Sequence, residues 1–162
     1  MRKELDEELC RKYPLIFADR NKPMTETAMC WGFDCGDGWF DILNQLCANI
    51  QQHIDWQNLV RERLLKDNPH NLTIPDEVPQ VVAAQVKEKF GSLRFYYRLE
   101  YDPINLKLAE KYPELKEDNK RYANFIDGIV HFAESASSHT CEVTGTKGTL
   151  CSRGGWLKTL NA

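Results

Sequence analysis

Residues 81–99 read VVAAQVKEKFGSLRFYYRL, and apolar and polar side chains alternate along both halves of this stretch. β-Branched and aromatic residues are enriched in it, which favours strands over helices. Lys89-Phe90-Gly91-Ser92 interrupts the alternation, and Gly91 can adopt the left-handed conformation that a tight turn needs. The stretch therefore predicts an antiparallel β-hairpin, around which the rest of the chain is organised.

This turn sets the pairing of the two predicted strands, with Lys87 opposite Arg94 and Gln85 opposite Tyr96. The register predicts one apolar face, which holds Val82, Ala84, Val86, Leu93, Phe95, Tyr97 and Leu99. It predicts one polar face, which holds Gln85, Lys87, Lys89, Arg94, Tyr96 and Arg98. A slip of one residue would mix the two sets, so the pattern itself supports this register.

The polar face gathers like charges, because Lys87 lies opposite Arg94 with Lys89 and Arg98 on the same face. Like charges directly opposite each other destabilise a strand pair, so a negative partner is expected. A bound phosphate held by arginine, with an aromatic group stacked on Tyr96, would meet this need. Carboxylates of the chain itself, such as Glu88, Asp34 or Asp37, or simple solvation of an exposed sheet face, would also meet it.

A second candidate segment, Gly36-Asp37-Gly38-Trp39, precedes an apolar stripe typical of a helix from Trp39 to Ile54. Asp37 or Gly38 can cap this helix, which leaves its first N–H groups directed at whatever lies above the loop. Helix N-termini favour anions, so we include Gly36, Asp37, Gly38 and Trp39 among the predicted ligand-binding residues. Gly-Asp-Gly is also ordinary turn chemistry, and the segment matches no Walker pattern.

Proline positions and apolar periodicity outline the other elements. We expect a short helix from Leu5 that is broken at Pro14, a helix capped by Asp55 that ends near Asn68, a connector with Pro75 and Pro79, a short helix between Pro103 and Pro113, and a longer helix ending between Ser135 and Thr140. The predicted class is α+β, with helices packed on a small antiparallel sheet built around the hairpin. We expect a core domain of residues 1–140 and a short C-terminal β segment, 141–162, packed on it.

The composition and charge of the chain limit the classes of function that it can have. The chain has 162 residues, of which 42% are hydrophobic and 28% charged, so one globular domain is expected. Its net charge of −3 gives no global attraction to nucleic acid or anionic membranes. No signal peptide and no long apolar run occur in the sequence, which predicts a cytoplasmic protein without a membrane partner.

Six cysteines are present, and in a reducing compartment they are expected to be thiols or metal ligands rather than disulfides. Cys141 and Cys151 outline a small zinc ribbon, with His139 nearby, but the second position of the first knuckle is Thr144. We therefore predict no metal and no other cofactor, and keep Cys141, Cys151 and His139 as candidate zinc ligands. No catalytic constellation is apparent, so an enzyme is not expected.

Three motifs together resemble a family of small, uncharacterised bacteriophage and prophage proteins. They are Gly36 to Trp39, Lys87 to Tyr96 with the pattern K-x-K-F-G-x-L-R-F-Y, and the Cys- and Gly-Trp-containing segment from Cys141 to Leu160. Members of the family are similar in ending in a zinc ribbon, whereas this chain has Thr144 and Asn161 where cysteines would be expected. The resemblance implies an accessory role in an infected cell.

These observations favour a non-enzymatic protein that binds a small anionic, nucleotide-like ligand, with countering of host defence signalling as the role that the resemblance implies. An alternative is a protein-interaction module whose basic hairpin face inhibits a host protein. A further alternative is a degenerate zinc-ribbon binder of nucleic acid, which the charge balance disfavours. The oligomeric state is not indicated, and a homo-oligomer is compatible with the sequence.

Overall fold

The computed structural model describes residues 1–70 and 77–161. Its central element is the hairpin of β2 (Gln80–Lys89) and β3 (Ser92–Glu100). The predicted register is confirmed, with Lys87 paired to Arg94 and Gln85 paired to Tyr96. Both Phe90 and Gly91 are left-handed in the turn, with φ of 56° and 79°. A turn with two left-handed central residues matches the twist of the flanking strands.

A register shift between Ala83 and Gln85 changes which residues of β2 face the core. Ala84 is the extra residue, so Val81 and Ala83 join Val86 in the main core, while Val82 turns to the opposite face. The prediction that Val82 and Ala84 lie on the core face was therefore wrong. A bulge reverses the alternation of side chains, and an unbroken apolar run gives no sign of where the reversal occurs.

The strand β1 (Phe33–Asp34) pairs in parallel with β2 and completes a three-stranded sheet of order β1-β2-β3. The predicted α+β class is confirmed, and this short parallel strand makes the sheet mixed. The register of β1 and β2 places Phe33 beside Val86 on the core face and Asp34 beside Lys87 on the outer face. Before the bulge, the chain around Ile16 lies against the edge of β2, because the Ile16 carbonyl accepts a hydrogen bond from the Ala83 N–H (2.8 Å).

One long helix, α2 (Phe40–Asp67), follows the glycine loop. The predicted division into two helices with Asp55 as a cap was wrong. The buried side chains of α2, among them Leu43, Cys47, Ile50 and Ile54, precede Asp55, but no glycine or proline interrupts the helix after it. The predicted Asp37 or Gly38 cap was also wrong. A 3₁₀ turn, η2 (Asp37–Trp39), enters the helix, and Trp39 occupies the cap position.

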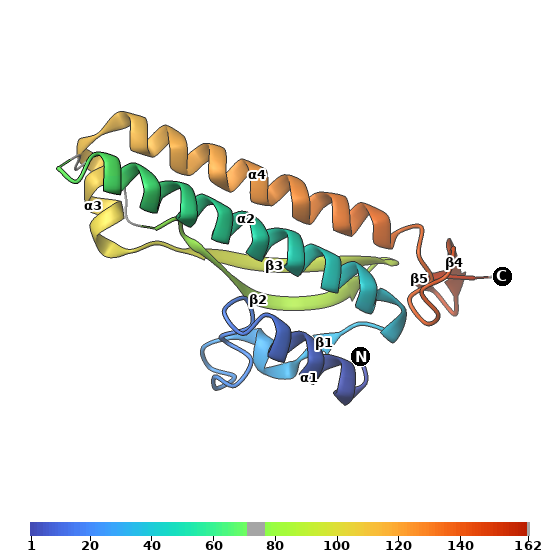
Figure 1. The fold of residues 1–162 in the computed structure, drawn as a ribbon. Helices are drawn as coiled ribbons and strands as arrows, with labels where there is room; N and C mark the ends of the chain where they lie inside the picture. The colour runs from blue at the N-terminus through green and yellow to red at the C-terminus, as the bar shows by residue number, and fades with distance from the viewer. Residues whose placement is uncertain (71–76, 162) are drawn as a thin grey trace.

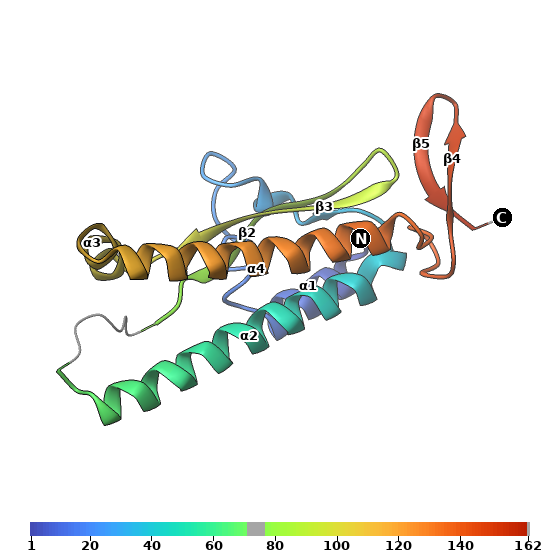
Figure 2. The same ribbon diagram turned by 90° about the horizontal axis from the view of Figure 1, so that it is seen from above.

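The other helices lie close to their predicted places. They are α1 (Lys3–Lys12), α3 (Pro103–Lys111) and α4 (Pro113–Ser137), with a 3₁₀ turn η1 (Ala28–Trp31) before β1. Figure 1 shows α2 and α4 side by side over one face of the hairpin, and α1 packs beside α2 near the β1 edge of the sheet. Seen from above in Figure 2, α2 and α4 diverge toward the end that carries α3.

A two-stranded hairpin, β4 (Thr149–Arg153) and β5 (Trp156–Leu160), ends the chain and lies at the tip of the β2–β3 hairpin (Figure 2). The buried Thr159 hydroxyl donates to the Gly91 carbonyl at 2.6 Å, which ties β5 to the β2–β3 turn. Within the described part of the chain, no helix is long and apolar enough to span a membrane. Part of the predicted connector, including Pro75, lies outside the described residues.

Candidate functional site

The outer face of the sheet, the face opposite α2 and α4, carries the predicted basic residues in rows. Parallel pairing of β1 and antiparallel pairing of β3 place Asp34, Lys87 and Arg94 in one row across the three strands. The next row pairs Gln85 with Tyr96, whose side chain is 43% exposed. The hairpin register therefore brings cationic, amide and aromatic groups onto one open surface.

Arg98, at the covered end of this face, is already neutralised. Its guanidinium binds both carboxylate oxygens of the buried Asp19, with Nη2···Oδ1 at 3.1 Å, and also contacts Glu100. The hydrogen bond from Arg98, and after it the one from Lys22, lowers the pKa of Asp19. The hydrogen bond to Asp19 in turn raises the pKa of Arg98. Arg98 thus has its anion within the chain.

Lys87 and Lys89 differ from Arg98, because neither has an ion-pair partner within 4.0 Å among the residues that the structure describes. The Lys87 ammonium lies 5.9 Å from the centroid of the Tyr96 ring, a cation–π contact. Arg94 donates to the Ser92 hydroxyl at 2.8 Å and reaches Glu134 only at 3.9 Å. The open end of the face therefore keeps two uncompensated ammonium groups.

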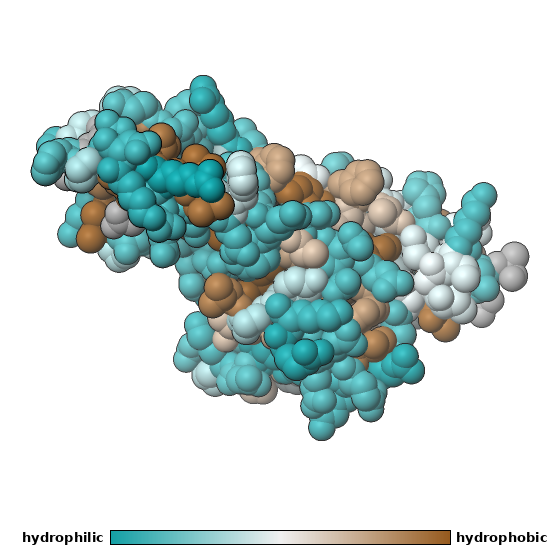
Figure 3. All heavy atoms as spheres, viewed as in Figure 1, coloured by the Kyte–Doolittle hydropathy of each residue, from teal (hydrophilic) through white to brown (hydrophobic). Residues whose placement is uncertain are grey.

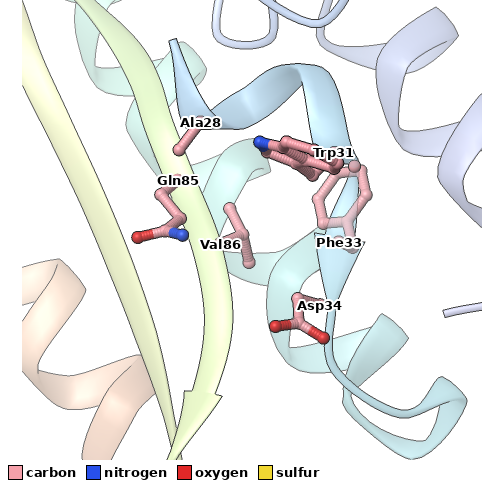
Figure 4. Close-up of a pocket in the computed structure, with 7 residues that line it drawn as sticks. Ala28, Trp31, Phe33, Asp34, Gln85 and Val86 are labelled. Atoms are coloured by element: carbon pink, nitrogen blue, oxygen red, sulfur yellow. The ribbon is translucent and has the colours of Figure 1, made fainter. Parts of the chain in front are cut away.

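A cavity of about 400 Å³ opens beside this row, between the η1–β1 segment and β2. Figure 4 shows Trp31, Asp34 and Gln85 around it, with Phe33 and Val86 forming part of the wall. The Trp31 side chain is 69% exposed. Trp31 was not among the predicted ligand-binding residues, although its place between Cys30 and Gly32, outside any apolar stripe, is a signal of exposure. The cavity combines an exposed indole with one carboxylate and one amide.

The glycine loop is occupied by the chain itself. The N–H of Gly36 donates to the Glu142 carboxylate (3.0 Å), and the N–H of Gly38 donates to the Glu142 carbonyl (2.8 Å). A Cβ on Gly38 would lie 2.3 Å from the Cys141 carbonyl oxygen, so the close approach requires glycine. The close approach that these glycines were predicted to allow is therefore made by the chain's own Glu142, which accepts from both N–H groups.

Asp37 and Trp39 are also used within the chain. Asp37 accepts from the Arg2 backbone N–H (2.8 Å) and forms an ion pair with the Arg2 side chain at 3.4 Å. Trp39 is fully buried and its indole N–H donates to the Thr140 carbonyl at 2.8 Å. The structure thus separates the predicted site into an open hairpin face and a glycine loop that binds the C-terminal segment.

Glu142 is the anion in this loop, and sequence reasoning missed it. Its carboxylate also accepts from Lys158 at 2.7 Å, although Glu142 itself is buried. Nothing in the local sequence distinguishes Glu142 from other acids, because its partners lie at positions 36 and 158.

The candidate zinc ligands do not form a cluster in the structure. Over residues 1–70 and 77–161, no group of three or more His, Cys, Asp or Glu side chains has metal-binding geometry. The thiol of Cys141 contacts Asn161 at 3.4 Å, and that of Cys151 contacts the Lys158 carbonyl at 3.3 Å. His139 contributes a backbone hydrogen bond, in which its carbonyl accepts from the Gly148 N–H.

The Cys141 thiol has an unusual environment. Burial acts to raise its pKa, but hydrogen bonds from the Thr144 hydroxyl and from the N–H groups of Thr144, Asn161 and Val143 lower the pKa to about 7. Thr144 thus occupies the second knuckle position as a donor to sulfur. Cys35 is the opposite case, since burial raises the pKa of its thiol to about 12 and disfavours the thiolate at neutral pH.

Comparisons of the chain with protein-family models, with curated proteins and with solved structures found no match.

Proposed function

We propose that this chain is a non-enzymatic binding protein whose outer hairpin face takes a phosphate-bearing, nucleotide-like ligand. The observation that carries the proposal is the pair of ammonium groups of Lys87 and Lys89, which have no ion-pair partner among the described residues and lie on the same face as Arg94 and the exposed Tyr96 ring. Gln85, two residues before Lys87, lines a cavity together with the exposed Trp31. A phosphate here would relieve the repulsion between Lys87 and Arg94 and gain charge-assisted hydrogen bonds.

The neighbouring row supports a nucleotide rather than a bare phosphate. Gln85 separates Trp31 and Tyr96, and both rings are exposed enough to stack with a base. The amide of Gln85 can both donate and accept, as recognition of a base edge requires. The Asp34 carboxylate would repel a phosphate at its own position but can accept from a ribose hydroxyl, which orients the phosphate toward Lys89 and the base toward Trp31.

The family resemblance supports a further part of this proposal. A host signalling nucleotide would be a suitable ligand, and its sequestration by an accessory phage protein would counter host defence signalling. Arg98 has no direct role in this proposal, because Asp19 already neutralises it.

Thermal-shift and calorimetric titrations with mono-, di- and cyclic dinucleotides test the proposal. At about millimolar concentration a nucleotide should raise Tm of the unmodified chain, since a ligand that binds only the folded state stabilises it. Lys87→Ala and Arg94→Ala should abolish this shift, and Trp31→Ala should weaken binding by about 1–3 kcal/mol if the indole stacks on the base. Lys116→Ala is the matched control, because Lys116 is exposed on α4, away from this face.

The absence of any shift with the whole panel would contradict the proposal. A shift with inorganic phosphate that is no larger with nucleotides would retain the anion site but exclude the role of the aromatic rings.

A further inference from the structure

A second surface, independent of the proposed nucleotide site, lies between α2 and α4. Two adjoining cavities of about 470 and 250 Å³ share the side chains of His53 and Phe125. Trp56 from α2 and Ile129 from α4 line the larger cavity. The two cavities adjoin at these shared side chains and so form one groove, between helices that diverge toward the end that carries α3 (Figure 2).

Aromatic surface is exposed in this groove and next to it. Trp56 and Phe125 line the groove and are 57% and 48% exposed, and Phe132, which lies beyond the lining, is 76% exposed. Phe125, Ile129 and Phe132 are spaced as i, i+4 and i+7, so they lie along one stripe of α4. Figure 3 shows apolar surface in brown and tan among polar residues over the middle of the helix pair. Contiguous exposed apolar side chains of this kind mark interaction sites.

His53 extends the apolar wall. Its ring lies 4.0 Å from the Phe125 ring, centroid to centroid, and burial lowers the pKa of His53. The imidazole is therefore neutral at physiological pH and adds no charge to the middle of the groove.

The smaller cavity adds a cation at one end. Arg61 donates from Nη1 to Gln57 at 3.2 Å, but its buried Nε has no acceptor within the described parts of the chain. No carboxylate described by the structure lies within 4.0 Å of the Arg61 side chain, because Asp118 pairs with Arg121 instead, at 3.6 Å. Burial lowers the pKa of Arg61, against the opposing effect of the nearby Asp118 carboxylate. Because no carboxylate of the described residues lies within 4.0 Å of this partly buried guanidinium, a carboxylate from outside can pair with it.

We propose that this groove binds an amphipathic helix of a partner protein, with apolar side chains spaced i, i+3 or i+4, and i+7 and with one carboxylate that reaches Arg61. The groove lining on α4 extends from Asp118 to Ile129. The exposed Phe132 continues the same stripe beyond it, which gives a span of about 21 Å from Asp118 at 1.5 Å per residue. An occupant of about 14 residues matches this length. An apolar stripe that ends at a cation is complementary to such a helix, as in other helix-in-groove complexes.

To test this, a library of displayed helical peptides of about 18 residues is selected for binding to the full chain. Peptides that also bind the Trp56→Ser variant are removed by counter-selection. Selected sequences should share the apolar stripe and an Asp or Glu near one end. A synthetic peptide and its Glu→Gln counterpart are then titrated by fluorescence anisotropy. Trp56→Ser and Phe132→Ser should each weaken binding at least about tenfold, since central aromatic groups dominate such interfaces. Trp156→Ser is the matched control, because Trp156 is 76% exposed on β5.

The charge is tested separately. Arg61→Gln should weaken the carboxylate peptide about tenfold and leave its Glu→Gln counterpart unchanged, with circular dichroism confirming the fold of each variant. Failure to select any peptide, equal binding to Trp56→Ser, or an Arg61 effect independent of the carboxylate would overturn the proposal. Sedimentation showing a dimer that Trp56→Ser dissociates would overturn it too, because the groove would then bind a second copy.

Discussion

Asp19 and Arg98 form an ion pair that removes one cation from the outer face. The Asp19 carboxylate is buried, and it accepts from Arg98 and, at 2.8 Å, from Lys22. Replacement by Asn should lower the free energy of unfolding by about 2 kcal/mol at pH 7, because one partner of a partly buried pair is removed. Glu100→Gln is the control and should change stability by less than about 0.5 kcal/mol, since Glu100 is half exposed.

The same pair predicts a pH dependence. Because the Arg98 contact lowers the pKa of Asp19 in the folded state, the stabilisation is complete above the unfolded-state pKa of about 3.9. It is lost as pH falls through the lower folded-state value. Denaturation at several pH values should show a constant difference between the unmodified chain and Asp19→Asn at neutral pH and a shrinking one below about pH 4. A difference that grows on acidification would contradict this assignment.

For single residues, the sequence predicts on which face of the hairpin a side chain lies better than it predicts the ion-pair partner of that side chain. Alternation placed Lys87, Arg94, Tyr96 and Arg98 on one surface, because side-chain direction in a strand is local. It could not show that Arg98 has an anion 79 residues away, while Lys87 has none among the residues that the structure describes. Ion pairing depends on how the N-terminal segment crosses the sheet, which no local pattern encodes.

The continuity of α2 gives a prediction at the scale of elements. Asp55 lies in the interior of the helix, where it accepts from the Gln51 side chain at 2.9 Å, whereas Asp102 caps α3 by accepting from the Ile104 N–H at 2.6 Å. Asp102→Ala should therefore cost about 1 kcal/mol, the usual effect of losing a cap. Asp55→Ala should change stability by less than about 0.5 kcal/mol, because alanine has the higher helix propensity.

Urea denaturation of the two variants measures this difference. A loss at Asp55 equal to that at Asp102 would indicate that a helix begins at Asp55, as its sequence suggested. Aspartate favours caps, but here the core residues of α2, from Leu43 to Ile54, all precede Asp55, and no glycine or proline interrupts the helix between Asp55 and Asp67. The two-residue strand β1 was equally inaccessible from sequence, because so short a segment has no period.

For the whole molecule, the contacts of the C-terminal segment make it part of the core structure. Glu142 fills the glycine loop, and Thr159 binds the turn of the central hairpin. The glycines at 36 and 38 suggested a close approach, which is correct, but composition could not show that the approaching group is the chain's own C-terminal segment. Its occupation of this loop directs the search for a ligand to the hairpin face.

If the C-terminal hairpin and the core unfold together, weakening their junction must destabilise both. Thr159→Val keeps the side-chain shape but removes the donor to the buried Gly91 carbonyl, which should cost about 1–3 kcal/mol for an unsatisfied acceptor. Thr149→Val, at an exposed position of β4, should lie within about 0.5 kcal/mol of the unmodified chain. Far-ultraviolet circular dichroism and tryptophan fluorescence should report the same lowered midpoint for Thr159→Val. If hydrogen exchange instead became faster only in β4 and β5, with the global midpoint unchanged, the hairpin would be an independently unfolding unit, because the junction would then contribute nothing to the stability of the core.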